Sequence, residues 1–226
     1  MKEIIKLLRP HQYIKNLFLF APLLFTFDIT LAKLEIVLYG FILFSLSASA
    51  IYVLNDYHDI LEGKAHPTKC KRPLASGAVS KQTALFLMFG LAMVSLSGAF
   101  LLSFQFFVIL LMYILMNIAY TFKLKHISIL DISIIALGFI LRIYGGAVLI
   151  DNTPSMWIVL VTFVLALFLA LAKRRDDCLL ANQGKKTRKN IDGYSLEMVN
   201  TAMTLMAGVT VVSYIMYTVS PEVIAR

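Results

Sequence analysis

Cysteine is scarce in this chain, and charge is sparse. The two cysteines, Cys70 and Cys178, lie in polar segments without the CxxC or His/Cys spacing that is typical of metal sites, so we expect free thiols. Charged residues make up 15% of the 226 positions and hydrophobic residues 59%, with a mean hydropathy of +0.80. Such a composition excludes a soluble globular protein and predicts a polytopic membrane protein.

A soluble domain with a basic face is also lacking, although the net charge is +8. The basic residues are clustered between long apolar runs, which speaks against nucleic acid as a partner. A cleavable signal is not expected either, because the first apolar run is long, contains Pro22 and has no small-residue cleavage site behind it. The lipid bilayer is therefore the predicted environment.

Seven apolar runs have about the 20 residues that a helix needs to cross the hydrocarbon layer. They span residues 17–31, with the first span expected to begin near Tyr13, and residues 36–54, 82–102, 104–122, 129–150, 156–172 and 194–219. The runs predict an all-α bundle of about seven transmembrane helices that forms one integral-membrane domain over residues 1–226. A charged loop is expected over residues 173–192, between the last two spans.

Lysine and arginine are distributed unevenly between the two sides of this bundle. Segments 1–15, 55–81, 123–128 and 173–193 contain 18 of the 21 basic residues. By the positive-inside rule, these segments and the N-terminus face the cytoplasm. The expected location is a bacterial-type inner (plasma) membrane, with the polar chemistry on the cytoplasmic side.

The polar stretch from Asn55 to Gly77 lies between two predicted spans and contains most of the candidate site. Asp56 and Asp59 are three positions apart, which places their carboxylates about 60° apart on one helix face. Together with Asn55 they are candidate Mg²⁺ ligands at the cytoplasmic end of a span. The plainer alternative is a helix end whose acids face water.

Basic residues follow ten positions later in the same stretch. His66, Lys69 and Arg72 are candidates for binding phosphate oxygens. Pro67 and Pro73 bracket the basic residues and favour a fixed loop, because each proline restricts its own φ and the residue before it. The alternative is that these cations only set the membrane topology.

A third polar group surrounds the start of the fifth span. It contains Tyr120, Lys123, Lys125 and Asp131, and an ionised Asp131 inside the span requires a partner or a metal. Arg142 lies on the same helix face, about 16 Å further along, which is too far for a direct ion pair with Asp131. We expect Arg142 either to bind an anionic group or to make a structural contact.

The basic run from Lys173 to Arg175 ends the sixth predicted span. A contact with lipid head groups is its simplest interpretation, with a phosphate contact as the alternative. Small residues at positions 45–50 and the pair Gly145–Gly146 are expected to allow close helix packing.

At this point the motifs resemble a known family. NDYHD, HPTKCKRPLASG, YTFKLKHISILD and the N-terminal RPHQYIKNLFLFAPL resemble the UbiA superfamily of intramembrane prenyltransferases, and most of all its branch that acts on decaprenyl phosphate. The resemblance covers nearly the whole chain. It implies a helical bundle around a central cavity open to the cytoplasm, and Mg²⁺-dependent transfer of 5-phosphoribose from phosphoribosyl diphosphate to a polyprenyl phosphate.

The resemblance also implies roles for individual residues. Asp56, Asp59, Lys69 and Arg72 are implied to be catalytic, and Asp56, Asp59 and Asp131 to bind the metal. The implied substrate-binding residues are Lys15, Asn16, Asn55, His66, Tyr120, Lys123, Lys125 and Arg142, and Arg9 and Gln12 match the N-terminal motif.

Two features depart from the family pattern. Gly63 stands where the first motif usually has a third acid, with Glu62 beside it. Family members also commonly have nine spans, two more than predicted here. Three alternatives remain at this stage: a prenyltransferase that uses a polyprenyl diphosphate and an aromatic acceptor, a multi-span carrier, and a non-catalytic scaffold.

Overall fold

The computed structural model describes residues 1–26, 29–64, 69–183 and 191–224. All secondary structure in these ranges is helical. The α-helices are α1 (Lys2–Leu8), α2 (Ala21–Thr26), α3 (Leu31–His58), α4 (Ile60–Lys64), α5 (Lys81–Leu102), α6 (Phe104–Phe122), α7 (Leu130–Leu149), α8 (Met156–Asn182), α9 (Leu196–Thr218) and α10 (Pro221–Ile224). The 3₁₀ helices are η1 (Pro10–Phe20), η2 (Lys69–Lys71), η3 (Leu124–His126) and η4 (Ile191–Gly193). The predicted all-α fold is confirmed.

Six helices in the described part of the chain are long and apolar enough to cross a membrane, namely α3, α5, α6, α7, α8 and α9. They correspond to the second to seventh predicted spans. The first predicted span is instead divided between η1 and α2. Pro22 lies at the second position of α2, where its missing N–H removes a donor from the backbone ladder. The count of seven spans therefore stays a prediction.

Four of the long helices have a serine or threonine as the N-cap residue. The side chains of Thr30, Ser80, Ser155 and Ser195 accept hydrogen bonds from backbone N–H groups three residues later, at distances between 3.0 and 3.3 Å. Each hydroxyl satisfies a donor that the first helical turn leaves unpaired. These caps therefore determine at which residue α3, α5, α8 and α9 begin.

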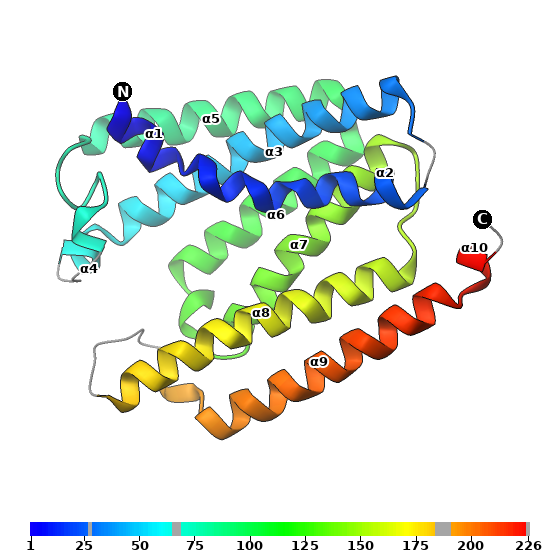
Figure 1. The fold of residues 1–226 in the computed structure, drawn as a ribbon. Coiled ribbons are helices and arrows are strands. Elements are labelled where there is room, and N and C mark those ends of the chain that lie inside the picture. The colour runs from blue at the N-terminus through cyan, green and yellow to red at the C-terminus, as the bar shows by residue number, and fades with distance from the viewer. Residues whose placement is uncertain (27–28, 65–68, 184–190, 225–226) are drawn as a thin grey trace. The chain divides into compact units, whose positions relative to one another are not determined.

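The chain divides into two compact units. Unit 1 contains residues 1–122 and 141–153, and unit 2 contains residues 123–140 and 154–226, so α7 contributes to both. In unit 1, α3 packs against α5, α6, η1 and α1 (Figure 1). In unit 2, α8 and α9 lie side by side. The single domain over residues 1–226 stays a prediction.

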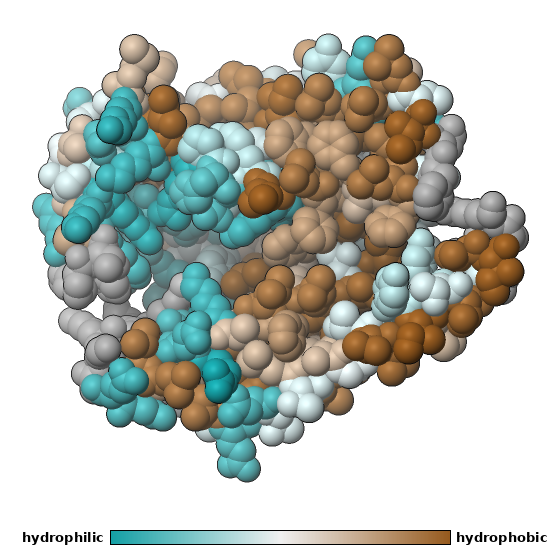
Figure 2. Space-filling model, viewed as in Figure 1, coloured by the Kyte–Doolittle hydropathy of each residue, from teal (hydrophilic) through white to brown (hydrophobic). Residues whose placement is uncertain are grey.

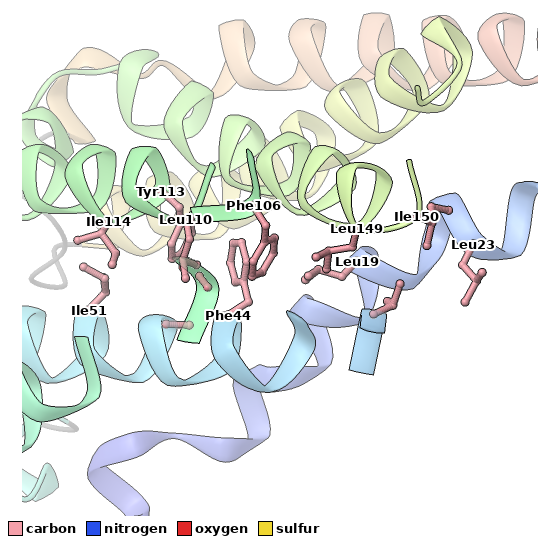
Figure 3. Packing of buried hydrophobic residues seen from close by; sticks show 13 residues of the cluster. Leu19, Leu23, Phe44, Ile51, Phe106, Leu110, Tyr113, Ile114, Leu149 and Ile150 are labelled. Carbon is pink, nitrogen blue, oxygen red and sulfur yellow. The ribbon is translucent and has the colours of Figure 1, made fainter. Parts of the chain in front are cut away.

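The core of unit 1 is built from large side chains on α3 and α6. Phe44, Phe106 and Tyr113 are at most 4% exposed and point toward one another between these helices (Figure 3). The rings of Phe44 and Tyr113 have centroids 4.6 Å apart, a favourable tilted arrangement. This core fixes the axis of α3, whose last turn carries the first acidic motif.

The predicted close packing of small residues is also found in unit 1. Ser47 donates to Ser95 on α5 at 2.7 Å, and both side chains are fully buried. A side chain on Gly146 would collide with the backbone of Leu19 on η1. Glycine is therefore needed where η1 approaches α7 this closely.

The expected loop over residues 173–192 is wrong in its first half. Helix α8 continues through the charged residues to Asn182, because alanine, leucine, lysine and arginine all favour the helical conformation. Cys178 consequently lies buried within α8 rather than in a loop, while Cys70 is half-buried, and both are free thiols.

Hydrophobic side chains cover much of the surface of these helices. In Figure 2, polar side chains gather at the end of unit 1 that carries α1 and α4, and hydrophobic side chains cover the opposite end around α2. Residues such as Phe86, Leu101 and Val212 are at least 59% exposed. Exposed apolar area of this extent on long helices is the surface of an integral membrane protein.

Candidate active site

The first acidic motif forms the C-terminal end of α3. Asp56 lies in the last turn and is 4% exposed, and Asp59 is the residue that caps the helix. Asn55 precedes them, and its Oδ1 accepts a hydrogen bond of 2.6 Å from the Thr121 hydroxyl on α6. The motif is therefore held by two helices of unit 1.

Two arginines bind the same oxygen of Asp56. Nη2 of Arg9 lies 2.5 Å and Nη1 of Arg72 lies 2.8 Å from Asp56 Oδ1. None of the hydrogen bonds of the described residues involves Oδ2. A buried carboxylate with two guanidinium partners leaves a net positive charge at this point, which favours an anionic ligand.

The N-terminal segment brings Arg9 to this position. Arg9 ends α1 in the left-handed conformation, with φ 54°. The Ser49 hydroxyl donates to the Leu8 carbonyl at 2.9 Å and lies 2.8 Å from the Tyr13 hydroxyl, so Tyr13 is the donor in the second contact. Leu7 is fully buried against Val53 and Leu74. Helix α1 is thus packed against α3 on one face.

Arg72 belongs to a loop that is fixed by its own backbone. Its N–H donates to the Lys69 carbonyl at 3.0 Å, and its carbonyl accepts from the Ser76 N–H at 2.9 Å. Val79 N–H closes the loop on the Pro73 carbonyl at 3.1 Å. The described part of the loop is therefore held by turn hydrogen bonds. Pro67 lies outside the described residues, so the fixed loop expected between the two prolines stays a prediction. Lys69 is half-buried in it, and His66 lies outside the described residues.

Gly63, at the position of the missing third acid, packs closely against the basic loop. Gly63 is buried, and a Cβ atom there would lie 3.3 Å from the Cβ of Ala75 in the basic loop. A side chain at this position would press its Cβ atom on Ala75, so the loop would have to shift by a few tenths of an ångström. Glu62, beside it, is exposed.

Asp56 and Asp59 are the acids of unit 1 that suit a divalent metal. Asp59 is half-buried, and its Oδ1 lies 3.0 Å from Nδ1 of His58. Mg²⁺ is usually bound by one or two carboxylates and completes its shell with water and substrate phosphates. The described residues contain no group of three or more metal-ligating side chains. This donor set fits Mg²⁺ carried by a phosphorylated substrate and does not fit a metal held by protein alone.

Asn16 and Arg142 meet in the core of unit 1. Arg142 Nε donates to Asn16 Oδ1 at 2.8 Å, and Asn16 Nδ2 donates to Ser45 at 2.9 Å. The guanidinium also contacts the Tyr113 hydroxyl at 3.2 Å and faces the Phe44 ring at 4.9 Å. Of the two expectations for Arg142, these contacts favour the structural one. A substrate-binding role for either residue stays a prediction.

The other residues implied by the resemblance lie outside this cluster. Lys15 is exposed on η1, next to buried Asn16, and Tyr120 is half-buried on α6. In unit 2, Lys123 is exposed and Lys125 half-buried around η3. Their roles stay predictions.

Asp131 lies at the start of α7 in unit 2 and has partners that the sequence did not reveal. Arg174 on α8 contacts its Oδ2, and the Tyr194 hydroxyl donates to its Oδ1. Arg174 is 1% exposed, so the head-group anchor expected for the basic run is wrong for this residue. Lys173 and Arg175 are exposed, as an anchor requires. Because α8 continues past Arg174, this guanidinium lies on the helix and reaches Asp131.

These features define a membrane-embedded, all-helical protein with paired carboxylates and arginines at the end of a span. The model of the UbiA prenyltransferase family matches residues 18–224. The chain therefore belongs to this family, and the prediction of a transferase enzyme is confirmed.

Several curated relatives share one enzyme name. The chain is 37% identical over 220 residues to the decaprenyl-phosphate phosphoribosyltransferase of Mycolicibacterium smegmatis, covering 93% of this chain and 68% of that protein. It is 32% identical to the enzyme of the same name from Mycobacterium tuberculosis, covering 93% and 72%.

Solved structures show the same fold. A UbiA homologue from Archaeoglobus fulgidus bound to GPP and Mg²⁺ superposes with a TM-score of 0.77 at 19% identity, covering 99% of this chain and 81% of that one. A digeranylgeranylglyceryl phosphate synthase gives a TM-score of 0.71 at 18% identity, covering 96% and 77%.

Proposed function

We propose that this enzyme transfers 5-phosphoribose from phosphoribosyl diphosphate to a polyprenyl phosphate of the decaprenyl type, releasing diphosphate. The observation that carries the proposal is the 37% identity to a decaprenyl-phosphate phosphoribosyltransferase over 93% of this chain. The pairing of Asp56 with two arginines supports it, because it places fixed positive charge beside the acids expected to meet a diphosphate. The active-site segments are proposed to face the cytoplasm.

In the proposed reaction the bond between the sugar C1 and the diphosphate oxygen breaks, and the diphosphate leaves with the electron pair. A phosphate oxygen of the lipid forms the new bond to C1. Negative charge builds up on the leaving group and positive charge on the sugar. Arg72 and Lys69 bind the leaving diphosphate, so their charge stabilises the transition state more than the ground state.

Asp56 and Asp59 would hold Mg²⁺, which when bound neutralises diphosphate charge as a Lewis acid. Lys123 and Lys125 are proposed to contribute further phosphate contacts from the second motif. The lipid acceptor is already an anion, so the reaction requires no general base. His58, whose Nδ1 lies 3.0 Å from Asp59 Oδ1 and whose ring packs edge-on against Phe122, has no proton-transfer role in this proposal.

The first test is donor binding to the purified protein in lipid nanodiscs. Phosphoribosyl diphosphate is expected to raise the melting temperature with Mg²⁺ and not with EDTA, and a polyprenyl diphosphate is expected to have no effect. A response to the polyprenyl diphosphate alone would assign the chain to prenyl transfer instead. If neither donor raises the melting temperature, the result contradicts both activities.

The second test is product formation with a radiolabelled donor and decaprenyl phosphate. Asp56→Asn and Asp59→Asn are each expected to lower kcat/KM at least 100-fold, a typical effect of losing one charge-stabilising group. Asp176→Asn is the matched control, because Asp176 is exposed on α8. Full turnover by both variants would rule out the metal role of these acids.

A further inference from the structure

Asp131 is fully buried, and protein groups bind both of its carboxylate oxygens. The Tyr194 hydroxyl donates to Oδ1 at 2.5 Å. Arg174 approaches Oδ2 with two nitrogens, Nε at 2.9 Å and Nη2 at 2.7 Å. Arg174 also contacts Asp177 at 3.1 Å. A metal at Asp131 would have to displace these donors, because both carboxylate oxygens already have protein partners.

The same tyrosine holds the backbone in front of α7. The N–H of Ile129 donates to the Tyr194 hydroxyl at 2.7 Å. Ile129 has φ 69°, a conformation that is strongly disfavoured for a β-branched residue and persists only where the surroundings hold it. One hydroxyl group therefore connects the second motif's acid with the strained residue two positions before it.

A second contact indicates that the segment before α9 holds the loop in front of α7. A side chain on Gly193 would collide with the side chain of Ser128. The turn of η4 is thus packed directly on the loop between α6 and α7, and Tyr194 follows it at once. Both observations lie within unit 2.

We propose that Asp131 is a positioning residue and not a metal ligand. With Arg174 and Tyr194 it fixes the loop of residues 123–130, and so places Lys123 and Lys125 for phosphate binding. This inference rests on the proposed function for the role of the two lysines. The metal is left to Asp56 and Asp59.

The loop depends on this fixation because it has little regular structure of its own. Within it, the N–H of His126 donates to the Lys123 carbonyl and that of Ile127 to the Leu124 carbonyl, at 3.1 and 3.2 Å. When Ile129 is released it returns to an extended backbone, which changes the direction of the chain between η3 and α7. The lysines then lose their fixed positions, and donor affinity falls while the metal site is unchanged.

The first experiment measures metal binding with saturating inorganic diphosphate, because the two acids suit a metal that a phosphorylated ligand carries, and it measures loop opening without any ligand. Mn²⁺ affinity, measured by electron paramagnetic resonance, is expected to stay within twofold of wild type in Asp131→Asn and Tyr194→Phe and to fall at least tenfold in Asp56→Asn. Hydrogen exchange of the peptide covering residues 123–131 is expected to accelerate at least tenfold in Asp131→Asn and Tyr194→Phe. Tyr214→Phe is the matched control, because Tyr214 is 59% exposed on α9.

The second experiment separates positioning from a general loss of structure. Tyr194→Phe and Asp131→Asn are each expected to raise the KM for phosphoribosyl diphosphate about tenfold, with kcat within twofold of wild type. The double variant is expected to be no worse than either single variant, since both changes release the same loop. The neutral pair Asp131→Asn with Arg174→Gln avoids an unpaired buried charge if a single variant fails to fold.

A fall in Mn²⁺ affinity in Asp131→Asn as large as in Asp56→Asn would overturn the proposal and assign Asp131 to the metal. Unchanged loop exchange in both variants would also overturn it. A wild-type protein that does not respond to phosphoribosyl diphosphate counts against the proposed function alone. The exchange comparison requires no donor and decides the anchoring role by itself.

Discussion

Arg9 and Asp56 are 47 positions apart, and the guanidinium of the first lies 2.5 Å from the carboxylate of the second. The contact makes the segment before the first long helix a part of the candidate active site. Asp56 also binds Arg72 through the same oxygen, so one buried acid orients two cations from different segments. When an anionic ligand binds, these cations are already in place, which lowers the cost of ordering them.

Replacement of Arg9 is therefore expected to impair catalysis. Arg9→Gln should lower kcat/KM about 100-fold, as the loss of one charge-stabilising group usually does. Arg9→Lys should recover only part of this loss, because lysine lacks the planar guanidinium that can contact two groups at once. Lys2→Gln, at an exposed position of α1, is the control. Wild-type kinetics in Arg9→Gln would exclude Arg9 from the site.

The contacts of Arg142 predict a structural phenotype. Arg142→Gln removes the donors to Asn16 and Tyr113 and leaves buried polar atoms unpaired, which costs about 1–3 kcal/mol for each such group. We expect a lower melting temperature in detergent with an unchanged KM for the donor. Tyr113→Phe should show a smaller loss of about 1 kcal/mol. A raised KM at full thermal stability would instead support the anion-binding role.

Two glycines on transmembrane helices make a matched pair for testing close packing. Gly146→Ala would force its methyl group against the backbone of Leu19, and overpacking of this kind typically costs about 1–3 kcal/mol. Gly90 lies on α5, and a Cβ atom there would have no heavy atom within 4 Å. Gly90→Ala is therefore expected to leave thermal stability unchanged or to raise it. Equal melting temperatures of the two variants would contradict the close approach of η1 to α7.

The sequence predicted most of the helices because each span is a long apolar run with polar ends. Helix α6 was predicted with its observed bounds, Phe104–Phe122. The predicted helix end was wrong where the helix continues beyond its apolar residues. Helix α8 continues for ten residues past the predicted end at Ala172, because helix propensity and the packing of Arg174 extend it beyond the apolar run.

The candidate site was predictable as a set of residues but not as a set of contacts. The spacing of Asp56 and Asp59 on one helix indicated a metal-binding face. The partners of Asp131 could not be found in this way, since Arg174 and Tyr194 lie 43 and 63 positions away. Which of several basic residues reaches a buried acid depends on helix packing. The spacing along the helix excluded Arg142 as a direct partner of Asp131, but nothing in the sequence pointed to Arg174.

The buried hydroxyl of Tyr194 predicts an alkaline limit of stability. Burial and the hydrogen bond to Asp131 raise the pKa of Tyr194 from its ordinary value of 10.0 to about 12. The folded-state pKa therefore lies above the unfolded one, so this tyrosine contributes its full stability below pH 10 and loses it as the pH rises to 12. The cause is that a phenolate at this position would repel the Asp131 carboxylate and could no longer donate to it, with Arg174 compensating only in part. We expect the melting temperature of the wild type to fall more steeply across this window than that of Tyr194→Phe. Parallel curves for the two proteins would show that the Tyr194 hydroxyl is not held by Asp131.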